Sequence, residues 1–106
     1  MMWTLDFHPK ADKELEKLNS SPKSHVVKAI FKVSKNPLPQ SEGGYGKPLG
    51  NKHSSKLAGC LKIKLKSIGI RVVYKLIRTD NVMKIIIISI RDDDEVCKEA
   101  ERRINR

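Results

Sequence analysis

A strict alternation of apolar and charged residues after position 60 constrains the fold of this chain more than any other feature. The apolar Leu61, Ile63 and Leu65 alternate with Lys62, Lys64 and Lys66. Because successive side chains of a β-strand point to opposite faces, this pattern predicts a strand with one apolar and one lysine face. Two more apolar segments follow, and we expect a three-strand meander over about 57–67, 70–78 and 82–91. The first predicted connection is a two-residue turn at residues 68–69.

The N-terminal third is predicted to add one strand and a helical hairpin. Residues 3–7 alternate apolar and polar side chains, as in a half-buried strand. Pro9 suits the first turn of one helix, and we expect Ser21 to cap a second helix that ends by Asn36. The aromatic residues interpreted as core are Trp3, Phe7 and Phe31, and Tyr74 is interpreted as structural.

Two segments complete the predicted architecture. Residues 37–56 are rich in Pro, Gly, Ser and Asn, which is typical of a long surface loop, and this loop is basic. A last helix is expected after Asp92 or Asp93, because Val96, Ala100 and Ile104 recur every four residues. We therefore expect an α+β fold, β-α-α-β-β-β-α, with the helical hairpin packed on a mainly antiparallel four-stranded sheet, as a single domain over residues 1–106.

Charge is distributed unevenly along the chain. Lys and Arg number 22 against 12 Asp and Glu, a formal net charge of +10. The 37 residues between Glu42 and Asp80 contain nine basic residues and no acidic one. Such an excess attracts phosphate polymers or an acidic partner. A merely solvated basic face would explain the alternation but not the missing acids.

The expected strand pairing gathers these charges on one face. With a two-residue turn, Lys66 lies opposite Arg71, Lys64 opposite Val73, and Lys62 opposite Lys75. Like charges directly opposite each other destabilise a sheet by up to about 1 kcal/mol each. Stability therefore did not select this arrangement, which indicates an anionic ligand.

The acid-free face also limits the chemistry. Magnesium-dependent cleavage of a phosphodiester needs carboxylates to hold the metal, so we expect neither a metal nor a cofactor. RNA carries its own nucleophile, the 2'-hydroxyl. An enzyme then needs a base for that proton, cations for the charge on the phosphate and an acid for the leaving oxygen. Neighbouring cations favour the neutral amine of a lysine, the form that acts as a base.

The chain resembles the RelE family of bacterial toxins over nearly its whole length. The resemblance rests on CLKIKLKSIGIRVVY at residues 60–74, on residues 5–7 and 47–50, and on Arg91 followed by residues 95–100. It implies a RelE-like fold and a toxin of a toxin-antitoxin module. Such a toxin cuts messenger RNA in the ribosomal A site without a metal and leaves a 2',3'-cyclic or 3'-phosphate and a 5'-hydroxyl.

The same resemblance assigns roles to individual residues. Lys62 and Lys64 match the family's lysine pair, one of them the base, and Arg71 matches the arginine that stabilises the transition state. Arg91 matches the arginine that assists the leaving oxygen. Cys97 stands where the family often has a tyrosine that stacks on or orients the substrate, so either the substrate is held differently or activity is reduced. The expected substrate-binding residues are Lys52, Lys56, Lys66, Lys75 and Cys97.

Two alternatives remain open from the sequence. The same superfamily includes toxins that poison DNA gyrase without cutting RNA, and a weakened toxin would bind RNA or the ribosome without cleaving it. In each case the expected partner is an antitoxin that covers the basic face or displaces the last helix, and operator DNA is bound only through that complex. Two cysteines and no signal or membrane segment lead us to expect a cytoplasmic protein that does not bind membranes.

Overall fold

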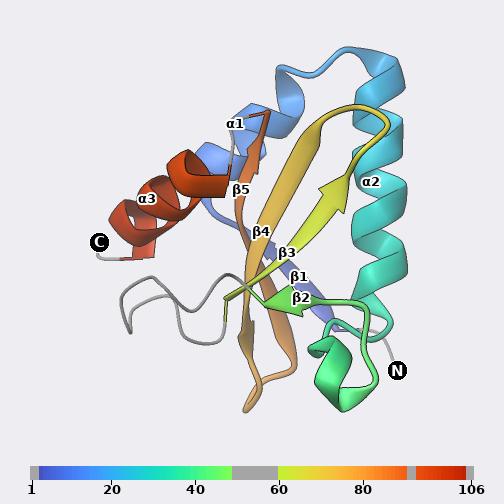
Figure 1. Ribbon diagram of the computed structural model, residues 1–106, viewed down its shortest axis with the longest axis vertical. Coiled ribbons are helices and arrows are strands. Elements are labelled where there is room, and N and C mark those ends of the chain that lie inside the picture. The colour runs from blue at the N-terminus through green and yellow to red at the C-terminus, as the bar shows by residue number, and fades with distance from the viewer. Residues whose placement is uncertain (1–2, 49–59, 91–92, 105–106) are drawn as a thin grey trace.

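The computed structural model describes residues 3–48, 60–90 and 93–104, which form a sheet with helices on both faces (Figure 1). Its five strands have the order β1-β5-β4-β3-β2. They are β1 (Thr4–Phe7), β2 (Lys47–Pro48), β3 (Cys60–Leu65), β4 (Ile70–Ile77) and β5 (Val82–Ser89). Strand β1 pairs parallel with β5, and the other pairs are antiparallel. The α+β class and the mainly antiparallel sheet are confirmed, and the two-residue β2 adds an edge strand to the four predicted ones.

Two helices, α1 (Pro9–Glu16) and α2 (Ser20–Ser34), form the predicted hairpin on one face of the sheet. Helix α1 begins at Pro9, as predicted, and Nδ1 of His8 accepts a hydrogen bond from the Lys10 N–H at 3.1 Å. The predicted cap of α2 was wrong, because its N-cap residue is Asn19 and Ser21 lies within the first turn. Both residue types are good N-caps, so composition alone did not choose between them.

The main hydrophobic core lies between this hairpin and the sheet. Trp3 and Phe7 pack against it as partly buried side chains, in line with their predicted place. Phe31 is instead 49% exposed, so its predicted core position was wrong. Val26, Ile30 and Val33 recur at spacings of four and three and occupy the sheet-facing side of α2. Phe31 follows Ile30 directly and is therefore turned about 100° around the helix from the sheet.

A smaller core lies on the opposite face, under helix α3 (Asp93–Ile104). It buries Cys60, Val73, Ile86, Ile87, Val96 and Ala100. Ile86 and Ile87 are consecutive, yet both join this cluster, because the β4–β5 register shifts at a β-bulge between Val73 and Tyr74. The bulge thus gives α3 two neighbouring isoleucines to pack against, and Figure 1 shows α2 and α3 on opposite sides of the sheet.

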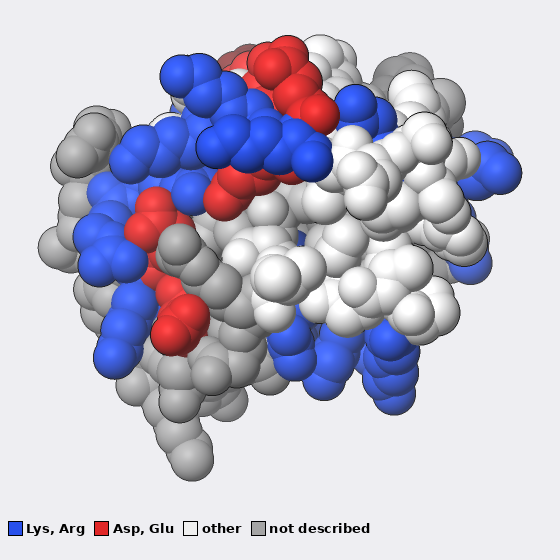
Figure 2. Space-filling view, turned by 90° about the horizontal axis from the view of Figure 1, so that it is seen from above, with Lys and Arg blue, Asp and Glu red and all other residues white. Residues whose placement is uncertain are grey.

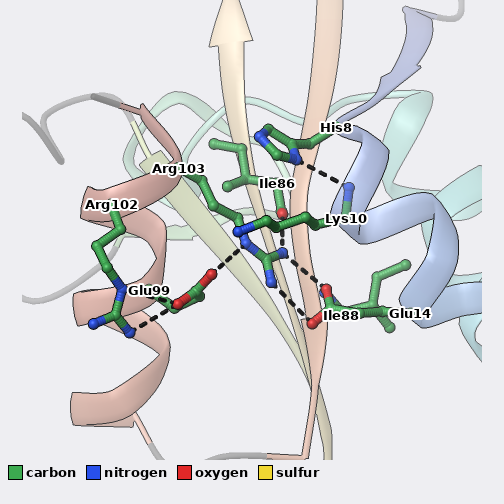
Figure 3. Close-up of polar contacts among 8 residues, drawn as sticks. All are labelled: His8, Lys10, Glu14, Ile86, Ile88, Glu99, Arg102 and Arg103. Atoms are coloured by element: carbon green, nitrogen blue, oxygen red, sulfur yellow. Dashed lines mark hydrogen bonds and ion pairs between the residues drawn. The ribbon is translucent and has the colours of Figure 1, made fainter. Parts of the chain in front are cut away.

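Arg103 connects α3 to the bulge and to α1 (Figure 3). The residue is 8% exposed, and its Nη1 donates to the Ile86 carbonyl at 2.6 Å. The guanidinium also bonds both carboxylate oxygens of Glu14, at 2.9 and 3.0 Å, and Oε2 of Glu99 at 2.7 Å. Partial burial alone raises the pKa of Glu99, but hydrogen bonds from Arg103 and Arg102 hold this pKa at about 2. Glu14 accepts a further bond from the Ile88 N–H at 3.1 Å.

The described part of the expected long loop is more ordered than predicted. It contains a short 3-10 helix (Gln40–Glu42) and β2. The buried Tyr74 hydroxyl donates to the Pro37 carbonyl at 2.8 Å, and burial raises the pKa of Tyr74, which keeps the hydroxyl a donor. A Cβ at Gly46 would collide with this hydroxyl. The interpretation of Tyr74 as a structural residue is confirmed. The rest of the predicted loop, residues 49–56, lies outside the described residues.

No helix in the described ranges is both long and apolar enough to cross a membrane.

Replacing Tyr74 by phenylalanine tests the anchor of the 37–48 segment. Tyr74→Phe removes one buried hydrogen bond and leaves the Pro37 carbonyl without its donor, so we expect the free energy of unfolding to fall by about 1–2 kcal/mol. Urea denaturation measures this change. The control is Tyr45→Phe, which removes the same group from a ring that is 49% exposed, with an expected change within about 0.5 kcal/mol. Equal changes in both variants would contradict an anchoring role.

Candidate functional site

The predicted basic face exists, but its register differs from the prediction. Lys64 lies directly opposite Arg71, and Lys62 lies opposite Val73. The predicted pairs, Lys66 with Arg71, Lys64 with Val73 and Lys62 with Lys75, are therefore wrong by two residues. The cause is the connection between β3 and β4, which is a four-residue turn over residues 66–69 rather than a two-residue turn. Gly69 closes it with φ +66°, a conformation that favours glycine.

A two-residue shift in a strand leaves every side chain on the same face. Lys62, Lys64, Arg71 and Lys75 therefore share one face, as predicted. Helix α3 packs on this same face, which was not predicted. Lys66 lies in the turn, and its side chain is exposed. Lys52, Lys56 and Arg91 lie outside the described residues. Cys97 belongs to α3, but its side chain lies outside what the structure describes.

The structure adds one residue to this face. Lys47 of β2 lies directly opposite Lys62 of β3, so their side chains project from the same side of the sheet. The sequence indicated Lys47 only as a basic residue of a loop. A lysine before proline in a two-residue strand carries no alternation, so periodicity did not identify it. Together Lys47, Lys62, Lys64 and Arg71 are called the cationic row below.

The cationic row has an uneven electrostatic environment. Strands β2 to β5 contain no acidic residue in their described spans. Arg71 is half-buried and its Nε atom is fully buried, whereas Lys64 is exposed. Charge is also uneven on the side of the molecule shown in Figure 2, where basic side chains gather along the lower edge and basic and acidic ones are mixed at the upper left. An anion at the row would therefore meet positive charge from several strands at once.

The row borders an open hollow at the end of the β3–β4 hairpin. The hollow has a volume of about 260 Å³ and is lined by Lys64, Leu65, Lys66, Gly69, Ile70 and Arg71. Among the described residues, His, Cys, Asp and Glu side chains form no group of three or more that would suit a metal ion. The chemistry available here is the binding of an anion, the stabilisation of charge that develops on it, and proton transfer by a lysine amine.

Comparisons with known proteins agree with this architecture. No protein-family model matches the chain. The chain is 34% identical over 104 residues to the mRNA interferase toxin RelE of Escherichia coli K12, covering 98% of this chain and 99% of that protein. The solved structure of a variant of E. coli toxin RelE in the free state superposes with a TM-score of 0.75, at 33% identity and coverage of 98% and 99%. The intact E. coli RelBE toxin-antitoxin complex matches with a TM-score of 0.68, at 28% identity and coverage of 85% and 98%.

Lys47→Glu tests the paired position of Lys47 and Lys62. The substitution replaces a like-charge pair by an opposite-charge pair, so we expect the free energy of unfolding to rise by roughly 0.5–1 kcal/mol. Urea denaturation of Lys47→Glu in the wild-type and Lys62→Ala backgrounds distinguishes the effect of this pair on stability from the effect of net charge. The gain is expected to vanish in the Lys62→Ala background. An equal gain in both would show that only net charge matters and would contradict the pairing.

Proposed function

The chain belongs to the RelE family of mRNA interferase toxins, and we propose that it cuts messenger RNA in the ribosomal A site by metal-independent attack of the 2'-hydroxyl, so inhibiting translation. The observation that carries this proposal is the cationic row on strands without acidic residues. A row of this kind suits a phosphodiester that supplies its own nucleophile. A metal-dependent nuclease would instead need carboxylates beside the scissile phosphate.

The cationic row can supply most of the groups that this reaction needs. Lys62 or Lys64, as a neutral amine, takes the proton of the 2'-hydroxyl, and the oxygen then attacks the adjacent phosphorus. Arg71 stabilises the charge that builds on the phosphate oxygens, aided by the neighbouring lysine, which stays protonated. The bond to the 5'-oxygen breaks while Arg91 stabilises the charge on that oxygen. The oxygen takes a proton from the lysine that was protonated in the first step or from water, which leaves a 2',3'-cyclic phosphate and a 5'-hydroxyl.

Further residues are proposed to hold the RNA. These are Lys47, Lys52, Lys56, Lys66, Lys75 and Cys97. Each lysine would neutralise a backbone phosphate, which makes binding strong at low salt and weak at high salt. Such contacts position the strand without reading its sequence. The codon preference would then come from contacts in the ribosome or from base contacts elsewhere.

The proposed partners follow from the family. E. coli RelE is known in a complex with its antitoxin RelB, and we propose that this chain is likewise held by a cognate antitoxin, through which alone it would contact operator DNA. Its proposed substrate is bound to a ribosome, which places the protein in the cytoplasm. The high positive charge would favour encounter with both the ribosome and an acidic antitoxin segment.

Arg71→Ala is expected to reduce cleavage by about 10²- to 10³-fold, because it removes a cation aimed at the developing charge. Primer extension on a messenger RNA in a cell-free translation system measures this, with and without ribosomes. Lys28→Ala, a charge loss on the exposed side of α2, is the matched control and should cut as the wild type does. Urea denaturation tests whether the variants fold. If Arg71→Ala does not fold, Arg71→Lys replaces it in the cleavage assay.

The outcomes of this experiment separate the functional alternatives. Breaks within codons that need both ribosomes and Arg71 support the proposed nuclease. Inhibited growth with intact RNA would favour a toxin that acts on DNA gyrase. If RNA and growth are both unaffected, the chain is a toxin that binds without cutting.

Cys97→Tyr is expected to raise cleavage in the same assay, because a phenol ring can stack on a base whereas a thiol cannot. A several-fold increase at subsaturating ribosome concentration would support a role of this position in substrate contact. Cys60→Tyr is not a suitable control, because Cys60 is buried. Cys97→Ser is suitable, and it should cleave as the wild type does. Unchanged cleavage by Cys97→Tyr would exclude the proposed contact.

A further inference from the structure

A second cationic feature lies on the α3 face, beside the cationic row. It is a cavity of about 400 Å³ lined by Lys75, Lys84, Arg103, His8 and the aliphatic Pro9, Ile77 and Ile86. Lys75 lies four residues beyond Arg71 on β4, which is roughly 13 Å along an extended strand. The small core at Val73 and Ile87, covered by α3, lies between the two. Lys62, at the near end of the row, is a diagonal neighbour of Lys75, so the cavity adjoins the row but is lined by different side chains.

The charge of this cavity comes from a pair of lysines. Lys75 and Lys84 lie directly opposite each other on β4 and β5, so both project from the same face. The cavity lining contains no carboxylate among the described residues. The third cation, Arg103, is already bonded to Glu14 and Glu99, so its charge is balanced. Asp6 of β1 lies opposite Lys84 on the other side of β5 and balances part of its charge, whereas Lys75 lies between Cys60 and Lys84. The excess positive charge at the cavity therefore comes mainly from Lys75, and the like-charge contact costs the sheet up to about 1 kcal/mol.

The other walls limit what the lysine pair can hold. His8 lines the cavity with a polar ring whose Nδ1 accepts the Lys10 N–H. Pro9 begins α1, and the positive end of that helix dipole adds to the potential. Ile77 and Ile86 provide an aliphatic surface. Positive donors beside an aliphatic surface, in a volume of this size, suit a phosphate that carries a nucleoside.

A phosphate fits this cavity better than a carboxylate does. A guanidinium can bind a carboxylate through two parallel hydrogen bonds. The guanidinium of Arg103 already makes such a pair with Glu14, so it is engaged within the fold. The groups that remain are ammonium ions, which bind phosphate as point charges. We propose that the cavity at Lys75, Lys84 and His8 is a second RNA phosphate-binding site, distinct from the site of cleavage. The choice of RNA as the source of the phosphate rests on the proposed function.

The test measures binding of an RNA that cannot be cleaved, so it does not depend on nuclease activity. The probe is a fluorescent 2'-O-methyl oligoribonucleotide, and anisotropy gives the Kd of the full chain at several salt concentrations. For Lys75→Gln/Lys84→Gln we expect about tenfold weaker binding and a salt slope smaller by about 0.7, the value for one single-strand phosphate contact. The matched control is Lys13→Gln/Lys28→Gln, which removes two exposed charges from α1 and α2 and should bind as the wild type does.

Three further measurements complete the test. Lys75→Gln/Lys84→Gln should unfold at a urea concentration close to that of the wild type, because it loses both the like-charge pair Lys75–Lys84 and the opposite-charge pair Asp6–Lys84. In the cell-free assay it should raise the KM for ribosome-bound RNA and leave kcat unchanged, whereas Arg71→Ala lowers kcat. If a nucleoside monophosphate displaces the RNA only weakly, the phosphate that binds at this site belongs to an RNA strand.

The contrary outcomes are equally distinct. RNA binding by Lys75→Gln/Lys84→Gln equal to that of the wild type overturns the second site, even if Arg71 proves essential for cleavage. Conversely, weakened binding by this variant, together with a failed Arg71 experiment, keeps the phosphate site and rejects the nuclease. If Lys75→Gln/Lys84→Gln no longer binds an acidic peptide of Asp and Glu residues but still binds the RNA, the ligand of this site is an acidic protein segment and not RNA. Full displacement by the nucleoside monophosphate would assign the site to a free nucleotide.

Discussion

The buried guanidinium of Arg103 connects helix α3 on one face of the sheet to strand β5 and to helix α1. A β-bulge in β5 leaves one residue without its place in the ladder, and the carbonyl of that residue, Ile86, accepts a hydrogen bond from Arg103. The same guanidinium reaches Glu14 of α1 and Glu99 of α3. Removing one partner from such a buried network costs about 3–5 kcal/mol, because the remaining charges stay desolvated. The position of α3 across the sheet therefore depends on a polar contact as much as on the small apolar core.

The position of α3 in turn decides how the cationic face is used. The helix covers Val73 and the paired isoleucines, which lie between Arg71 and Lys75 along the sheet. One cationic face thereby carries both the cationic row and the cavity beside α3. Three members of the row lie on β3 and β4, whose other faces pack into the main core, so their charges are held by rigid elements. Burial of Val73, Ile86 and Ile87 fixes the strands in place, and this keeps the neighbouring cations close together despite their repulsion.

The sequence predicted the periodic parts of this structure well. Alternation at Lys62 and Lys64 fixed the face on which these lysines lie, and a two-residue error in register did not change it. The error arose because the same residues can form a two- or a four-residue turn, and local sequence does not decide between them. The loop prediction for 37–48 missed β2, since this strand is specified by its edge partner, β3, and by the Tyr74 hydroxyl, both distant in sequence.

Two other features depend on long-range contacts that periodicity does not report. Ile86 and Ile87 point to one face only because of the bulge, which breaks the alternation that predicts strand faces. Arg103 looks like a basic residue placed to complement a helix dipole, yet it is one of the most buried charged groups described. Its acidic partner Glu14 lies 89 residues away, so no local pattern could pair them.

The short edge strand has a consequence for the behaviour of the protein in concentrated solution. β2 ends the sheet at Pro48, a residue with no backbone N–H to offer a further strand. Open sheet edges recruit other chains and lead to fibrillar aggregation. A proline at this edge, beside a lysine that repels its own copies, opposes such growth. The chain can therefore carry a strongly charged face without polymerising along the sheet edge next to it.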